Sequence, residues 1–148
     1  MDNNKKVYIS WDQFYKDTLE LCNKITNLKD IKGMVCITRG GMVPGCIVAS
    51  KLNIRKIETI SIKSYQDNLE ISDSFEILVE PKEALQDLGK NWIVIDELID
   101  SGQTLKHIKQ ILPFANIYTV YSKILDSDLV NSYFRYYDKS HWICFPWE

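Results

Sequence analysis

The stretch that decides the fold of this 148-residue chain is Trp92-Ile93-Val94-Ile95-Asp96-Glu97-Leu98-Ile99-Asp100-Ser101-Gly102-Gln103-Thr104-Leu105. It starts as a bulky apolar run of the kind that forms a buried parallel strand. Two adjacent carboxylates follow, and then a turn that carries hydroxyls and a glycine and leads towards a helix. A strand, a polar turn and a helix in this order indicate an α/β fold.

The turn Ser101-Gly102-Gln103-Thr104 suits a phosphate group. A turn at a helix start offers several backbone N–H groups, here beside two hydroxyls, and the helix dipole adds a partial positive charge. Asp96 and Glu97 cannot bind phosphate directly. They suit ribose hydroxyls or Mg²⁺, a hard cation that takes oxygen ligands and lies beside phosphates. The stretch therefore predicts a ligand with a ribose, a phosphate and a metal ion.

The whole sequence bounds the class of protein. Its length predicts a single domain over residues 1–148. The formal net charge of −2 gives no support for a nucleic-acid partner, because such surfaces are usually basic. No run approaches the 18 or more apolar residues of a membrane span, and no signal-peptide core follows the first residues, so we expect a cytoplasmic protein without an integral membrane segment. The four cysteines show no CxxC spacing, which favours buried free thiols.

Apolar periodicity predicts the remaining elements. Helices are expected over residues 11–27, 43–52 and 105–112, the first behind a Ser10–Gln13 capping box. Strands are expected over 34–37, 56–62, 92–95 and 117–121, with a possible short strand over 75–79. Strands and helices that alternate in this way predict a mostly parallel open sheet flanked by helices. Ligands of such sheets lie at the carboxyl ends of the strands, so residues 38–41, 96–104 and 123 should converge.

Arg39 and Gly40 follow the second of these strands. Glycines permit a close backbone approach to a ligand, and an arginine supplies a forked, permanent cation for phosphate oxygens. A Gly-Gly turn alone is weak evidence, since such turns also serve as plain connections. Residues 64–89 are polar and rich in turn-forming residues, which favours a mobile loop or hairpin over the site.

The residues quoted so far resemble the type I phosphoribosyltransferases. Ile93 to Thr104 is similar to their signature for 5-phosphoribosyl-1-pyrophosphate. Four further segments are similar, in order and spacing, to the bacterial xanthine-guanine members of the family: Thr38 to Gly45, Ser64-Tyr65, Lys123, and Trp142-Ile143 with Pro146-Trp147-Glu148. The resemblance implies the fold of that family, with a small base-binding hood and Mg²⁺ as cofactor. It also implies a homodimer or homotetramer.

The resemblance assigns a role to each site residue. The 5-phosphate is expected on Ser101, Gly102, Gln103 and Thr104, and the ribose and Mg²⁺ on Asp96 and Glu97, possibly through water. The pyrophosphate is expected on Arg39 and Gly40. Asp100 is implied as the general base near N7 of a purine. Lys123 would donate to O6, Trp142 would stack on the base, and the Ile143 backbone would meet its 2-substituent. Without this pattern, an isolated lysine is usually a surface charge and an isolated tryptophan near a terminus is usually packing.

These roles predict a purine salvage enzyme that acts on guanine or xanthine, and less well on hypoxanthine. The chain departs from the xanthine-guanine pattern in two ways: Asp96-Glu97 replaces two aspartates, and Ser101-Gly102-Gln103-Thr104 replaces Thr-Gly-Gly-Thr. In addition, residues 66–80 carry five acids and no Lys or Arg, where relatives often have a basic residue. Two other functions remain open. One is a nucleotide-sensing regulator on the same fold, and the other is a phosphoribosyltransferase for a different base.

Overall fold

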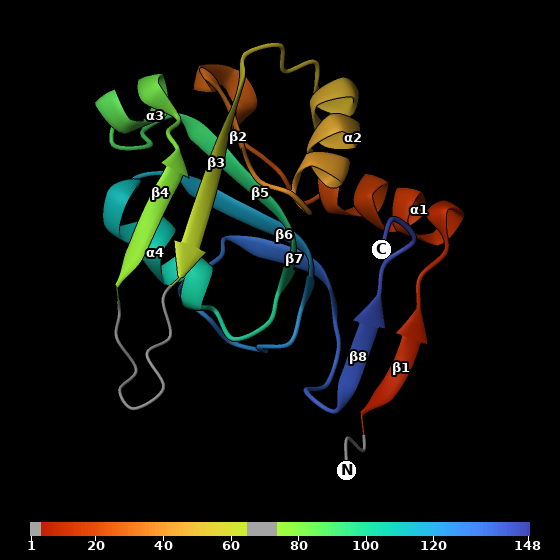
Figure 1. The fold of residues 1–148 in the computed structure, drawn as a ribbon. Helices are drawn as coiled ribbons and strands as arrows, with labels where there is room; N and C mark the ends of the chain where they lie inside the picture. The colour runs from red at the N-terminus through yellow and green to blue at the C-terminus, as the bar shows by residue number, and fades with distance from the viewer. Residues whose placement is uncertain (1–3, 65–73) are drawn as a thin grey trace.

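The structure is a computed structural model that describes residues 4–64 and 74–148. The elements follow one another as listed here (Figure 1): β1 Lys5–Tyr8, α1 Trp11–Cys22, the 3₁₀ helix η1 Leu28–Asp30, β2 Gly33–Ile37, α2 Met42–Leu52, β3 Ile57–Ser64, β4 Phe75–Val79, α3 Lys82–Gln86, β5 Trp92–Ile99, α4 Gln103–Ile111, β6 Asn116–Ser122, β7 Ser132–Tyr136 and β8 His141–Cys144. None of the described helices is long and apolar enough to span a membrane.

The main sheet has six strands in the order β4-β3-β2-β5-β6-β7. All neighbouring pairs are parallel except β3 with β4, so the predicted mostly parallel sheet is confirmed. The chain moves outward from β2 to β3 on one side, and from β5 to β6 and β7 on the other. The carboxyl ends of β2 and β5 therefore lie side by side at the switch point of the sheet, where open α/β sheets bind their ligands.

Helices cover both faces of this sheet. Buried side chains of α1 and α2 pack with one face, in a core that includes Phe14, Val48 and Ile95. Those of α3 and α4 pack with the other face, in a core that includes Ala84 and Ile108. Strand β5 is buried from Trp92 to Asp96, as its apolar run predicts, because it lies in the middle of the sheet between both layers.

Helix α1 begins as predicted but ends earlier. The backbone N–H of Gln13 donates to Ser10 Oγ at 3.1 Å, which is half of the predicted capping box. The other half does not form, because the side chain of Gln13 donates to Asp17 Oδ1 at 2.7 Å instead. The helix ends at Cys22 and not at residue 27. Ile25 fits the helical spacing and is buried, but it reaches the core from the loop that follows the helix.

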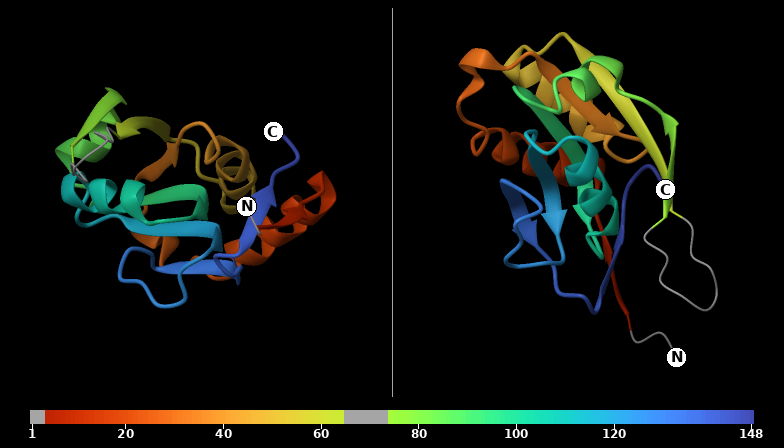
Figure 2. Two further views of the ribbon diagram at one scale, coloured as in Figure 1. Left: turned by 60° about the horizontal axis from the view of Figure 1, so that its bottom comes forward. Right: turned by 90° about the vertical axis from the view of Figure 1, so that its left-hand side faces the viewer.

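A second, two-stranded sheet joins the two ends of the chain. β1 and β8 pair in parallel, with Lys6 beside Trp142 and Val7 beside Ile143. Figures 1 and 2 show these strands side by side and apart from the main sheet. That a small hood binds the base stays a prediction. Sequence periodicity did not predict either strand.

The predicted hairpin exists as β3 and β4, which pair antiparallel from Ser61–Val79 to Ser64–Phe75. The segment between them, residues 65–73, is outside the described part of the chain, and so is the prediction that it forms a mobile loop over the site. Each cysteine is a free thiol. Cys22 and Cys36 are buried as expected, but Cys46 is exposed on α2, which corrects the expectation that all four thiols are buried.

Candidate functional site

Strand β5 carries the acid pair inside the sheet. The sequence suggested that the strand ends at the acids, but it continues through Asp96 and Glu97 to Ile99. Asp96 is 8% exposed, and its Oδ1 accepts the backbone N–H of Glu97 at 2.9 Å. Burial, and then the neighbouring Glu97 carboxyl, raise the pKa of Asp96 well above its usual range. Glu97 Oε2 is buried and has no hydrogen-bond partner among the described residues.

The turn after β2 lies directly against this acid pair. A Cβ atom added to Gly40 would lie 2.1 Å from Glu97 Oε2. A Cβ atom on Gly41 would lie 2.5 Å from the carbonyl oxygen of Ile37 and 2.6 Å from that of Ile95. A side chain at Gly41 would therefore require backbone atoms to shift, whereas one at Gly40 would displace the end of the Glu97 side chain. Arg39 is exposed beside them, and its peptide bond with Thr38 is cis.

The turn after β5 forms a small hollow at the start of α4. Gly102 has φ +85°, a conformation that favours glycine, and it precedes Gln103, the first residue of the helix. The backbone N–H of Gln103 donates to Ser101 Oγ at 3.3 Å. The hollow has a volume of about 60 Å³. Its lining is Asp96, Leu98, Ile99, Asp100, Ser101, Gly102, Gln103, Thr104 and Leu105.

Lys123 joins three elements of the predicted base site. Its side chain is 7% exposed, and its Nζ lies 3.3 Å from Asp100 Oδ1, while Asp100 itself is 68% exposed. The same Nζ lies 5.9 Å from the centroid of the Trp142 ring. The backbone N–H of Lys123 donates to the Ile99 carbonyl at 2.8 Å, which fixes the residue just past β6. A lysine this deeply buried is not the solvated surface charge that an isolated lysine usually is.

Trp142 and Ile143 present two different surfaces of β8. The Trp142 side chain is 53% exposed, whereas the Ile143 side chain is buried in the core beneath the small sheet. A ring half open to solvent and close to a buried ammonium group can stack on a planar ligand. The structure thus brings together Asp100 after β5, Lys123 after β6 and Trp142 on β8. Separately, it places the turn after β2 against the acid pair.

The sequence did not single out Thr119 or His107. Thr119 of β6 pairs in register with Asp96, and its hydroxyl is buried without a hydrogen-bond partner in the described part of the chain. His107 lies on α4, one helical turn after Gln103, and is 1% exposed. The only signal for Thr119 is a hydroxyl in the middle of an apolar strand.

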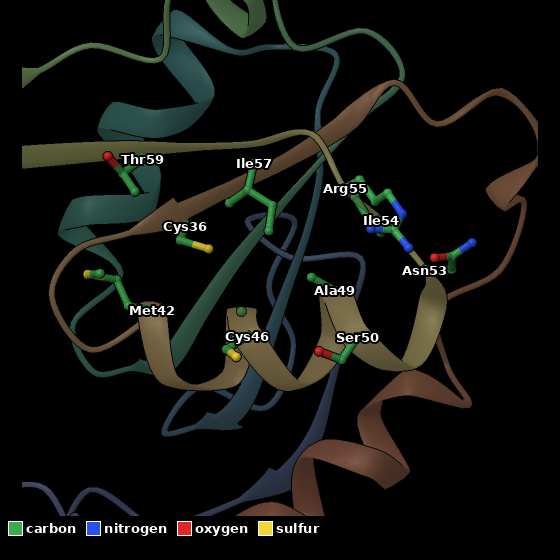
Figure 3. A pocket seen from close by; sticks show the side chains of 11 residues that line it. Cys36, Met42, Cys46, Ala49, Ser50, Asn53, Ile54, Arg55, Ile57 and Thr59 are labelled. Atoms are coloured by element: carbon green, nitrogen blue, oxygen red, sulfur yellow. The ribbon is translucent and has the colours of Figure 1, made fainter.

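A larger cavity of about 560 Å³ lies along α2 and contains none of the predicted site residues. Figure 3 shows Cys36, Met42 and Cys46 at one end of it and Asn53 and Arg55 at the other. The smaller hollow is instead lined by six of the predicted site residues, Asp96 and Asp100 to Thr104.

Comparison with known proteins agrees with this geometry. The model of the phosphoribosyl transferase domain family matches residues 10–145. The chain is 38% identical over 148 residues to a xanthine-guanine phosphoribosyltransferase of Desulfotalea psychrophila, with 99% of this chain and 89% of that protein covered. It is 34% identical over 145 residues to one from Chromohalobacter salexigens, with 98% and 85% covered. Its fold is similar to the crystal structure of a purine phosphoribosyltransferase from Pyrococcus horikoshii, with a TM-score of 0.77 at 23% identity and 100% and 95% of the chains covered.

Proposed function

Because the chain belongs to the phosphoribosyltransferase family, we propose that it transfers the phosphoribosyl group of 5-phosphoribosyl-1-pyrophosphate to a 6-oxopurine. The products are a nucleoside 5-monophosphate and pyrophosphate. Guanine and xanthine are the preferred bases, and hypoxanthine is used less efficiently. The observation that carries this proposal is the contact of the buried Lys123 with Asp100 and Trp142 beside the phosphate turn.

The base would lie between the small sheet and the phosphate turn. The ring of Trp142 stacks on the purine, and the Lys123 ammonium donates to O6. An amino group at that position cannot accept this hydrogen bond, so adenine leaves a buried cation unpaired and is a poor substrate. The backbone of Ile143 faces the 2-substituent.

The phosphoribosyl donor would extend from this base site towards β2. The 5-phosphate binds the N–H groups and hydroxyls of Ser101, Gly102, Gln103 and Thr104. Asp96 and Glu97 hold the ribose hydroxyls, and Arg39 and the Gly40 backbone hold the pyrophosphate.

During transfer the bond from C1 of the ribose to the pyrophosphate oxygen breaks and a bond to the purine nitrogen forms. Asp100 accepts the proton that the purine loses, and Arg39 neutralises charge that develops on the leaving group.

The acid pair fits Mg²⁺. The partnerless Oε2 of Glu97 beside a second carboxyl is an oxygen donor set of the kind that Mg²⁺ uses. The usual magnesium site in phosphate chemistry takes one or two carboxylates and completes its shell with substrate oxygens and water. When bound, the ion would neutralise charge on the pyrophosphate.

A nucleotide-sensing regulator on this fold is the second candidate. Such a protein would not need a proton acceptor at position 100, and a nucleic-acid partner would require a basic surface. The net charge of −2 and the Lys123–Asp100 pair favour the enzyme. We place the enzyme in the cytoplasm, where its substrates occur.

A panel of bases tests the substrate assignment. Pyrophosphate release is measured with 5-phosphoribosyl-1-pyrophosphate, Mg²⁺ and guanine, xanthine, hypoxanthine, adenine or a pyrimidine. We expect guanine and xanthine to give the highest kcat/KM and EDTA to abolish turnover. A pyrimidine or hypoxanthine alone as substrate would overturn the base assignment, and no release with any base would favour the regulator.

Asp100→Asn tests the proton acceptor. The amide cannot accept the purine proton, so we expect kcat to fall by about 100-fold or more, the usual contribution of general base catalysis. Binding of the phosphoribosyl donor, measured by calorimetry, should change little. An unchanged kcat would remove Asp100 from this role.

A further inference from the structure

A buried histidine lies behind the phosphate turn and contacts its glutamine. Nε2 of His107 is 3.4 Å from Nε2 of Gln103, one helical turn earlier on α4. The His107 side chain is almost completely buried, and the ring of Phe75, the first residue of β4, stacks on it at 4.1 Å with an interplanar angle of 29°. Gln103 is also one of the residues that line the small hollow.

The chemistry of this contact sets the direction of the hydrogen bond. An amide nitrogen only donates, so Nε2 of His107 is the acceptor for Nε2 of Gln103. Nδ1 of His107 is buried and has no hydrogen-bond partner among the residues that the structure describes. A buried polar atom without a partner costs free energy, which is not expected at a position that serves packing alone.

The glutamine is a departure from the signature that this chain resembles. The similar xanthine-guanine signature has glycine where this sequence has Gln103, and glycine has no side chain to place. A glutamine at the first position of α4 has a long, flexible side chain at the edge of a hollow of only about 60 Å³. A side chain of this length can reach the space of a bound phosphate, so its contacts decide where it lies.

We propose that His107 is a positioning residue that holds the Gln103 side chain away from the hollow that receives the 5-phosphate. Phe75 fixes the plane of the imidazole so that Nε2 faces Gln103. This role deepens the proposed function and rests on it, because it assigns the hollow to the 5-phosphate of the phosphoribosyl donor. His107 itself does not touch the substrate.

A double-mutant cycle tests the role. His107→Phe keeps an aromatic ring for Phe75 to stack on but removes the acceptor, and Gln103→Met keeps the length of the side chain but removes the donor. We expect either variant to raise both the KM and the calorimetric Kd for 5-phosphoribosyl-1-pyrophosphate with Mg²⁺ about fivefold, the effect of one neutral hydrogen bond. In His107→Phe, whose side chain does not touch the substrate, the kcat and the KM for guanine should change less than twofold. The double variant should be no worse than either single variant, because both remove the same contact.

Two further variants separate positioning from structure. His107→Asn keeps an acceptor near the glutamine and should restore part of the affinity, whereas a loss that tracked only the melting temperature would contradict the role. Gln103 is only partly buried, so we expect Gln103→Met to fold. This variant therefore tests the role even if His107→Phe does not fold. Unchanged KM and Kd in Gln103→Met, or effects that add in the double variant, would overturn the inference. Failure of the wild-type protein to bind the phosphoribosyl donor would instead overturn the proposed function.

Discussion

Two adjacent glycines after β2 serve different neighbours, although they look alike in the sequence. The missing Cβ of Gly40 faces the end of a side chain, the Glu97 carboxylate, which can move. The missing Cβ of Gly41 faces two backbone carbonyl oxygens, of Ile37 and Ile95, which cannot move without disturbing β2 and β5. The size of the residue at position 40 is therefore limited by the Glu97 carboxylate, and the size of the residue at position 41 by the backbone of β2 and β5.

Alanine at each position separates these constraints. Gly40→Ala should displace the Glu97 carboxylate, weakening binding of 5-phosphoribosyl-1-pyrophosphate with Mg²⁺ at least about tenfold while unfolding in urea changes by less than about 1 kcal/mol. Gly41→Ala should destabilise the fold by about 2–3 kcal/mol, as overpacking against fixed atoms does. Calorimetric binding and urea titration on both variants check this. A loss of stability in Gly40→Ala as large as in Gly41→Ala would contradict the difference.

The sequence indicates the candidate site residues but not their surroundings. Asp96, Asp100 and Gly102 stand in a local strand–turn–helix pattern that chemistry alone can read. The contacts of Lys123 with Asp100 and Trp142 join residues that are separated in the chain. The contact of Gly40 with Glu97 depends on which strands are neighbours. The burial of Thr119 and His107 depends on how the helices pack on the sheet. These relations are set by the tertiary structure.

At the scale of elements, α1 is fixed to the sheet by a buried hydrogen bond. Asp17 is 2% exposed, and its Oδ2 accepts the hydroxyl of Tyr121 on β6 at 2.6 Å. Burial, together with this hydrogen bond, raises the pKa of Tyr121 above its ordinary value, so the phenol remains a donor. Arg135 of β7 also approaches Asp17, at 3.5 Å. Because Tyr121 lies two residues before Lys123, this bond also supports the strand that leads to the base site.

Removing this hydroxyl should destabilise the protein. Tyr121→Phe leaves a buried carboxylate oxygen without its donor, so we expect a loss of about 1–3 kcal/mol in the free energy of unfolding. Tyr15→Phe is the matched control. Tyr15 is an exposed tyrosine of α1, the helix that carries Asp17, so loss of its hydroxyl should change stability by less than about 0.5 kcal/mol. Urea titration of both variants measures the difference. Equal stabilities would show that the hydroxyl contributes nothing.

The sequence predicted elements where local periodicity is strong. The apolar runs of β2, β5 and β6 and the stripes of α1 and α4 are local signals, and their existence is confirmed. β1, β7 and β8 were not predicted, since each is a short strand whose side chains are partly exposed and whose identity depends on a distant partner. The short helix α3 follows Pro81 in a segment read as a loop, and five residues give too little periodicity to detect it.

At the scale of the whole molecule, the outer strand β4 is a candidate contact between copies. It is an edge of the main sheet, and it exposes Leu78 by 55% and Val79 by 47%. An edge strand with exposed apolar side chains can pair with a strand of another chain. We therefore expect a homodimer or homotetramer.

Light scattering after size exclusion measures this assembly. The expected mass is two or four times the 17.3 kDa of one chain. Leu78→Glu should shift the mass towards the monomer, because a charge at the contact opposes association, whereas Leu88→Glu, at an exposed leucine outside β4, should not. A 17.3 kDa species for the wild-type protein would contradict the expectation.

The pairing of β1 with β8 has a consequence for the order in which the site forms. The phosphate turn joins β5 and α4, which are adjacent in the chain, whereas Trp142 is held by a strand that pairs with residues near the other end. Closing a loop of nearly the whole chain costs more entropy than forming a local turn. During synthesis on the ribosome, the proposed binding residues for the phosphoribosyl group can therefore come together before β8, which carries the proposed base-stacking residue, has been made. A nascent chain that stops before β8 should therefore retain phosphate recognition and lack purine recognition.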